Sequence, residues 1–151
     1  MAGSNRPDAL SLVVYSGDYD KVHYALVLAS SALALGTRAT LFFTMDACRA
    51  LLKPDPSGTP AWRRLPLGQS TANNFRDGGA MDDDFKGRRL ADFEQLLAAC
   101  VELRARVIVC ELGLKARGLA PEDLRADLPI EIAGAATFIE DASKNGAMLF
   151  I

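Results

Sequence analysis

The sequence predicts an α/β protein, organised as a three-layer sandwich with a mostly parallel five-stranded sheet and flavodoxin-like topology. Two observations indicate this class. Short apolar runs alternate along the chain with longer stretches of helical periodicity, and such alternation is typical of parallel strands joined by helices on both faces of a sheet. The chain has 151 residues, and 50% of them are hydrophobic, which suits one domain with a substantial core. We therefore expect residues 1–151 to form a single domain.

Five segments have the composition of buried strands. Each is a short run rich in valine, isoleucine, leucine or phenylalanine that is bounded by turn or polar residues. The first run, LSLVVY, stops at Ser16, Gly17 and Asp18, and the third, RVIVC, stops at Cys110. The predicted strands are residues 10–15, 38–44, 106–110, 130–133 and 147–151.

Helical periodicity occupies most of the intervals between these strands. Residues 21–35 are apolar nearly all the way round, with Asp18 or Asp20 as the expected cap and Gly36 as the expected end. Such a helix is covered on more than one side, and in a chain of this size we expect the second cover to be another subunit. Further helices are predicted within residues 46–53, 89–104, 112–117 and 134–143.

Residues 54–88 interrupt the alternation. This segment is rich in proline and glycine and contains the acidic run Asp82, Asp83 and Asp84. Because the periodic pattern resumes afterwards, we expect a long insertion, either functional or mobile, rather than a domain boundary. The acidic run is expected in a solvated loop or at a helix cap, since three adjacent carboxylates do not share a face in regular structure.

Charge and composition exclude several function classes. The formal net charge is −2, unlike the basic footprint of a protein that binds nucleic acid. No apolar run is long enough for an integral membrane segment. The polar start of the chain is a poor match to a secretory signal. We therefore expect a cytoplasmic protein that binds no nucleic acid.

The cysteine content favours free thiols. The three cysteines, Cys48, Cys100 and Cys110, are an odd number, which argues against a disulfide framework in a reducing compartment. There is no CxxC pair, and His23 is the single histidine, so neither a zinc site nor another metal site is expected. The glycine motifs of nucleotide-binding folds are absent, and no cofactor is expected.

Two of these cysteines fall where the chain leaves the predicted sheet. Ligands of open α/β sheets bind outside the carboxyl ends of the strands. Residues 16–20, 45–48 and 110–113 leave the sheet at that edge and include Cys48 and Cys110. Cys100 lies on the apolar face of a predicted helix and is expected in the core.

Cys110 has two interpretations that these residues leave open. It ends a strand just before an expected helix start, where backbone N–H groups favour the thiolate, the nucleophilic form. Glu111 acts in the opposite direction, because a nearby carboxylate disfavours the thiolate. Cys110 is thus either a nucleophile at the edge of the sheet or a buried structural residue, the commoner case for cysteine.

The neighbouring candidates also carry two interpretations each. Cys48 is either a second, resolving thiol or part of a short amphipathic helix. Lys21 either attracts an anionic sulfur group or is solvated, and His23 either exchanges protons with Cys110 or is a hydrogen-bonded structural residue. The candidate pocket residues are Ser16, Gly17, Asp18, Lys21, His23, Glu111 and Gly113.

Four blocks, taken in order, resemble the DsrE/DsrF-like family, and most of all its DsrE2-type branch. They are VVYSGDYDKVHYALVLASSALALG, RATLFFTMDACRALLK, RVIVCELGLKARGLAPEDL and GAATFIEDASKNGAMLFI. The resemblance implies a DsrE-like α/β fold that assembles into oligomers. It also implies that the cysteine at the end of the third core strand, here Cys110, carries sulfur as a persulfide.

Together, these residues and the resemblance predict a sulfur carrier related to sulfurtransferases. Cys110 would hold sulfane sulfur and exchange it with donor and acceptor proteins or small thiols. The alternative is a non-catalytic oligomeric binding module with a small-ligand or peptide pocket at the carboxyl edge of the sheet. A homo-oligomer is expected in both cases.

Overall fold

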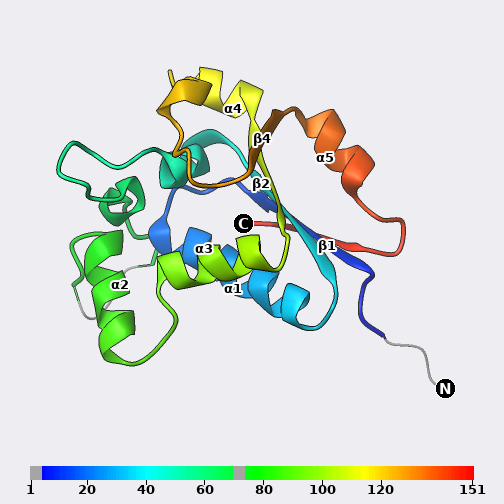
Figure 1. The fold of residues 1–151 in the computed structure, drawn as a ribbon, viewed down its shortest axis with the longest axis horizontal. Helices are drawn as coiled ribbons and strands as arrows, with labels where there is room; N and C mark the ends of the chain where they lie inside the picture. Colours follow the sequence, from blue (N-terminus) through cyan, green and yellow to red (C-terminus); the bar gives the residue numbers. More distant parts are fainter. Residues whose placement is uncertain (1–4, 70–73) are drawn as a thin grey trace.

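A single parallel sheet organises the computed structural model, which describes residues 5–69 and 74–151. Its five strands are β1 (Ala9–Val14), β2 (Arg38–Phe43), β3 (Arg106–Cys110), β4 (Ile130–Ala133) and β5 (Ala147–Phe150), in the spatial order β4-β3-β2-β1-β5. All four pairings are parallel, so the predicted fold class is confirmed. The strand order departs from the 2-1-3-4-5 order of flavodoxin. The chain steps outward from β1 to β4 and then crosses the sheet to place β5 on the other side of β1 (Figure 1).

The two faces of the sheet are covered unequally (Figure 1). Helices α1 (Tyr19–Ala34) and α3 (Phe93–Glu102) pack side by side over one face and enclose the main core. The second cover of α1 therefore comes from α3, where the sequence had suggested another subunit. The opposite face carries the seven-residue helix α5 (Ala135–Asp141).

Short elements surround the carboxyl ends of the strands. The 3-10 helix η1 (Met45–Leu51) follows β2, and helix α4 (Glu111–Ala116) follows β3 and packs against η1. The 3-10 helix η3 (Pro121–Asp123) leads toward β4. No helix in the described part of the chain has both the length and the apolar character needed to cross a membrane.

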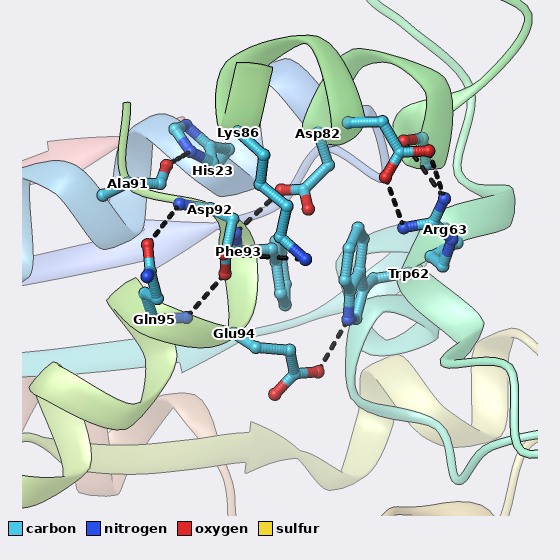
Figure 2. Close-up of polar contacts among 12 residues, drawn as sticks. His23, Trp62, Arg63, Asp82, Lys86, Ala91, Asp92, Phe93, Glu94 and Gln95 are labelled. Atoms are coloured by element: carbon cyan, nitrogen blue, oxygen red, sulfur yellow. Dashed lines mark hydrogen bonds and ion pairs between the residues drawn. The ribbon is translucent and has the colours of Figure 1, made fainter. Parts of the chain in front are cut away.

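The segment of residues 54–88 is folded onto the body wherever the structure describes it; residues 70–73 lie outside the described part. It contains the 3-10 helix η2 (Ala61–Arg64) and helix α2 (Gly78–Gly87), and α2 was not predicted from the sequence. Trp62 stacks on Phe93 with 4.6 Å between ring centroids, and its indole N–H donates to Glu94 at 2.8 Å (Figure 2). The side chain of Trp62 thus fixes η2 to the start of α3.

The acidic run lies within helix α2, so the expectation of a solvated loop or cap is wrong, and its side chains have two different environments. Asp82 is buried and accepts hydrogen bonds from the Tyr19 hydroxyl at 2.5 Å and the Phe93 backbone N–H at 2.8 Å. Asp83 and Asp84 pair instead with arginines on the outer side, Arg63 and Arg88. Helical geometry turns one carboxylate of the three inward, because successive residues lie about 100° apart around the axis.

Candidate functional site

Three loops pack tightly against one another at the carboxyl edge of the sheet. A Cβ placed on Gly17 would lie 2.7 Å from the Asp46 Cβ, and one placed on Gly113 would lie 2.6 Å from the Met45 backbone nitrogen. Both separations are shorter than real Cβ contacts. Glycine is therefore required at both positions by the packing of the loop after β1, and of α4, against the start of η1.

The Asp46 carboxylate interacts with two arginine side chains at this edge. It accepts a hydrogen bond from the Arg117 Nε at 2.6 Å and lies 3.8 Å from the Arg49 Nε. The preceding Met45 adopts a φ of 52°, a left-handed conformation that is unfavourable for a residue with a Cβ. The contacts of Asp46 and Gly113 hold the chain in that conformation.

A cavity of about 540 Å³ opens beside β1, η1 and the segment after η2. Within it, the Ser16 hydroxyl accepts a hydrogen bond from the Asp18 backbone N–H at 3.1 Å, and Lys21 lies 3.6 Å from the Asp18 carboxylate. The structure thus brings together four residues that the sequence had placed in one pocket. The full lining is Tyr15, Ser16, Gly17, Asp18, Lys21, Asp46, Arg49, Leu65 and Pro66.

One wall of this cavity comes from the segment of residues 54–88. The Tyr19 backbone N–H donates to the Pro66 carbonyl at 2.8 Å, and the Asp20 carboxylate accepts from the backbone N–H groups of Gly68 and Gln69 at 2.7 and 2.9 Å. Asp20, one of two expected helix caps, therefore binds this segment to the start of α1. Nothing in the sequence pattern could have placed Leu65 and Pro66 there, because the segment has no periodicity.

His23 is not at this cavity. Its Nε2 lies 3.0 Å from the Ala91 carbonyl oxygen (Figure 2). The centroid of its ring lies 4.8 Å from that of Phe85. This geometry supports the structural interpretation of His23. It does not support a proton exchange with Cys110.

Glu111 and Gly113 also lie outside the cavity lining. The Glu111 carboxylate is exposed and accepts from the Lys115 ammonium at 3.0 Å. Gly113 is buried against η1, as described above. These two residues shape α4 and its packing rather than the pocket.

Cys110 occupies the carboxyl end of β3 and is the N-cap residue of α4. Its thiol is free, and the residue is 5% exposed. The side chain packs with Phe42, Ile108 and Phe138 on the face of the sheet opposite the main core. Cys110 is therefore beside α5 and does not line the cavity between β1 and η1.

The other two thiols are buried in the main core. The Cys48 Sγ lies 3.8 Å from the Phe43 carbonyl oxygen, and the Cys100 Sγ lies 3.7 Å from that of Leu26. Burial, together with the neighbouring Cys110, raises the pKa of the Cys48 thiol to about 12, and burial raises that of Cys100 to about 11. Both groups are protonated at neutral pH, so neither is a nucleophile where the structure places it.

The two raised values predict a loss of stability at alkaline pH. An unfolded thiol has an ordinary pKa of 9.0, so above that pH the unfolded chain loses protons that the folded chain keeps. The free energy of unfolding should then fall as the pH rises from 9, up to about pH 11 for Cys100 and about pH 12 for Cys48. The expected slope is up to about 1.4 kcal/mol per pH unit for each thiol. Urea titrations from pH 7 to pH 10.5 measure this slope. Cys48→Ala and Cys100→Ala should each flatten it, and slopes equal to that of the wild type would contradict the assignment.

In the described residues, no three histidine, cysteine, aspartate or glutamate side chains are grouped so that they could hold a metal ion. The chemistry of the site that the structure does show is that of the Cys110 thiol, one of three free thiols, and of a mixed-charge cavity at the same edge of the sheet. Comparison with known proteins adds to this geometry. A model of the DsrE/DsrF/DrsH-like family matches residues 7–150.

The chain belongs to the DsrE/DsrF/DrsH-like family.

Two relatives match this DsrE-like chain over nearly its whole length. The protein YrkE of Bacillus subtilis is 27% identical over an aligned length of 154 positions, gaps included, and the match covers 93% of this chain and 95% of YrkE. A protein of Allochromatium vinosum named sulfur carrier protein DsrE2 is 26% identical over an aligned length of 163 positions, gaps included, and the match covers 94% of this chain and 97% of that protein.

Two solved structures share the DsrE-like fold. MTH1491 from Methanobacterium thermoautotrophicum, a protein of unknown function, has a TM-score of 0.58 at 10% identity. YchN from E. coli has a TM-score of 0.57 at 17% identity. Each match covers 95% of this chain and 98% of the other. At these identities the likeness concerns the fold alone.

Proposed function

We propose that this protein is a cytoplasmic sulfur carrier in which Cys110 holds sulfane sulfur as a persulfide and passes it to a partner thiol. The observation that carries the proposal is the free thiol of Cys110 at the carboxyl end of β3. It stands in a chain that aligns over 94% of its length with a protein named a sulfur carrier. The donors and acceptors are proteins or small thiols that themselves form persulfides.

The chemistry is a thiol exchange that needs no external oxidant. The Cys110 thiolate attacks the outer sulfur of a donor persulfide, R–S–SH. A new S–S bond forms on Cys110, the S–S bond of the donor breaks, and the donor leaves as the thiolate R–S⁻. The proton stays on the transferred sulfur, and the reverse attack by an acceptor thiolate on that sulfur regenerates Cys110.

Intact-mass measurement tests this proposal. After incubation with inorganic polysulfide, the wild-type protein should gain about 32 Da per transferred sulfur, and dithiothreitol should remove it. Cys110→Ser should gain nothing. Cys48→Ser and Cys100→Ser serve as matched controls and should load as the wild type does, because the raised pKa values of these two thiols keep them protonated. A wild-type protein that is folded but takes up no sulfur would contradict the proposal.

A second candidate function follows from the cavity. Its lining does not contain Cys110, and the cations Lys21 and Arg49 lie there beside the carboxylates of Asp18 and Asp46. The cavity is therefore suited to a small polar ligand, independently of any sulfur transfer. In that case the protein is a binding module, and ligand uptake would survive Cys110→Ser. Isothermal titration of the wild type and Cys110→Ser with inorganic phosphate or thiosulfate separates the two functions.

The protein is also proposed to assemble with a second copy of itself through the uncovered half of its sheet. Phe150 and Met148 of β5 pair with Val13 and Ser11 of β1. They therefore share the face that carries α5, where Phe150 is 69% exposed. Parallel sheets are normally covered on both faces. A second copy carries the same exposed residues, Met148 and Phe150, and can therefore cover this face in a symmetric contact.

Light scattering tests the assembly. The wild type should exceed the monomer mass at micromolar concentration, and Phe150→Asp should be a monomer. Leu35→Asp, at a similarly exposed apolar residue just after the carboxyl end of α1, should assemble as the wild type does. A wild-type monomer would contradict this part of the proposal.

A further inference from the structure

On the face of the sheet opposite the main core, Cys110 belongs to a small buried cluster that includes one residue of the short helix α5. Its neighbours in the small apolar cluster are Phe42 and Ile108, which belong to the sheet, and Phe138, which comes from α5. Only 5% of the residue is exposed, so a reagent in solution has little direct access to the thiol. A reagent or partner must therefore displace something, and a side chain of α5 can move with less disruption than one of the central strands.

The apolar packing of α5 on the sheet depends on a single buried side chain. Phe138 is 3% exposed and stacks on Phe42 with 4.9 Å between ring centroids. It is the one buried residue of α5, whose neighbour Ile139 is 64% exposed. A helix of seven residues with one buried side chain has little of the packing that normally stabilises a helix in a protein.

The two ends of α5 are anchored very differently. At its carboxyl end, the Asp141 side chain accepts hydrogen bonds from the Thr40 hydroxyl and from Arg106 Nη1, the latter at 2.8 Å. The Asp141 backbone carbonyl also accepts from Arg38 Nη2 at 2.8 Å. These bonds tie that end to the starts of β2 and β3.

Among the described residues, no side-chain hydrogen bond anchors the amino end of α5, which lies next to the thiol. It begins after Gly134, whose position as N-cap provides no side-chain hydrogen bond and where an added Cβ would meet nothing within 4 Å. The residue before it, Ala133, is the register partner of Cys110 in the sheet. The less restrained end of the helix is thus the end beside Cys110.

We infer that α5 is a cover over Cys110, which opens at Gly134 while Asp141 stays attached, so that Phe138 leaves the thiol and a partner reaches it from this face of the sheet. The inference rests on the proposed function, for which it names the direction of approach. It also separates the route to Cys110 from the cavity between β1 and η1. The exchange partner then contacts α5 and the sheet beneath it rather than the loops after β1 and β2.

Alkylation of the native protein measures the opening directly. Iodoacetamide is added without denaturant, and peptide masses give the rate at each cysteine separately. Phe138→Ala should speed the reaction of Cys110 at least about tenfold, since the cover loses its one buried side chain. Phe138→Leu, which keeps an apolar side chain, should fall between this variant and the wild type. Ile139→Ala removes an exposed side chain from the same helix and should react like the wild type.

The buried thiols Cys48 and Cys100 are internal controls for general unfolding. Their rates should not change in Phe138→Ala, because they lie on the other side of the sheet. An unchanged rate at Cys110 in Phe138→Ala, or an equal acceleration of all three cysteines, would overturn the inference.

A measurement on the wild type keeps the inference testable even if Phe138→Ala fails to fold. Local opening exposes little surface, so the rate at Cys110 should depend only weakly on low urea concentrations, whereas the rates at Cys48 and Cys100 should rise steeply. Equal urea slopes for the three thiols would contradict a local cover.

The cover and the sulfur-carrier function can fail separately. Alkylation does not depend on persulfide chemistry, so a fast Phe138→Ala with a wild type that takes up no sulfur would retain the cover and refute the carrier. If the wild type loads sulfur on Cys110 but Phe138→Ala leaves the alkylation rates unchanged, the carrier function is retained and the cover is refuted.

Discussion

Replacing Asp82 by alanine is expected to lower the free energy of unfolding by about 3 kcal/mol. The Asp82 carboxylate is buried and is the acceptor for both the Tyr19 hydroxyl and the Phe93 backbone N–H. Its loss leaves those two donors without an acceptor in a region closed to water. Burial and the Asp82 hydrogen bond also raise the pKa of the Tyr19 phenol, which keeps it protonated as a donor.

The neighbouring residue provides a matched control for this substitution. Asp83 carries the same side chain one position later, but its carboxylate is mostly exposed and pairs with Arg63. Asp83→Ala should cost less than about 1 kcal/mol, as surface ion pairs do. Urea denaturation of both variants gives the comparison, and equal losses would show that Asp82 does not connect α2 to the body of the protein.

Gly113→Ala is expected to destabilise the protein by about 2 to 3 kcal/mol. The new methyl group would meet the Met45 backbone nitrogen at 2.6 Å and the Thr44 hydroxyl at 2.7 Å. Backbone cannot turn aside as a flexible side chain can, so α4 would have to move away from η1. The sequence had placed Gly113 in a pocket; its close contact with η1 makes it a packing residue instead.

Thermal or urea unfolding measures this loss, and Gly87→Ala is the control. Gly87 is the last residue of α2, and an added Cβ there meets nothing within 4 Å. That variant should match the wild type or slightly exceed it, because alanine has the higher helix propensity. A Gly113→Ala variant as stable as Gly87→Ala would mean that α4 does not pack against η1 as described.

The sheet could be predicted because its strands are compositionally distinct. The run RVIVC is β3, and LSLVVY contains most of β1. Short runs of β-branched and apolar residues that are bounded by turn residues are typical of buried strands. The strand order could not be predicted in the same way. It depends on which way each crossover turns, and the apolar pattern of a strand is the same whichever neighbour it has.

Helix α2 was missed because its sequence, GGAMDDDFKG, opens with two glycines and has three adjacent acids. Both glycines are explained by close packing: added Cβ atoms would meet Tyr19 at Gly78 and Arg63 at Gly79. Such tertiary contacts override helix propensity, and no local pattern reveals them.

The site was predicted in part. Ser16 and Lys21 could be placed at one edge because both follow β1 directly, and the carboxyl ends of parallel strands meet there. His23 was misplaced because it lies two positions after Lys21 in α1. Its side chain therefore points away from the edge and toward Phe85 and Ala91. The face to which Cys110 points depends on the register of β3, and the cover that α5 forms over it has no signal in the sequence.

Locating the persulfide in the wild-type protein tests the central claim most directly. The protein is loaded with polysulfide, blocked with iodoacetamide and digested, and the mass of each cysteine peptide is read. The account predicts an added sulfur on the peptide that contains Cys110 and none on those that contain Cys48 or Cys100. Sulfur on either of those peptides, or on no cysteine at all, would contradict it.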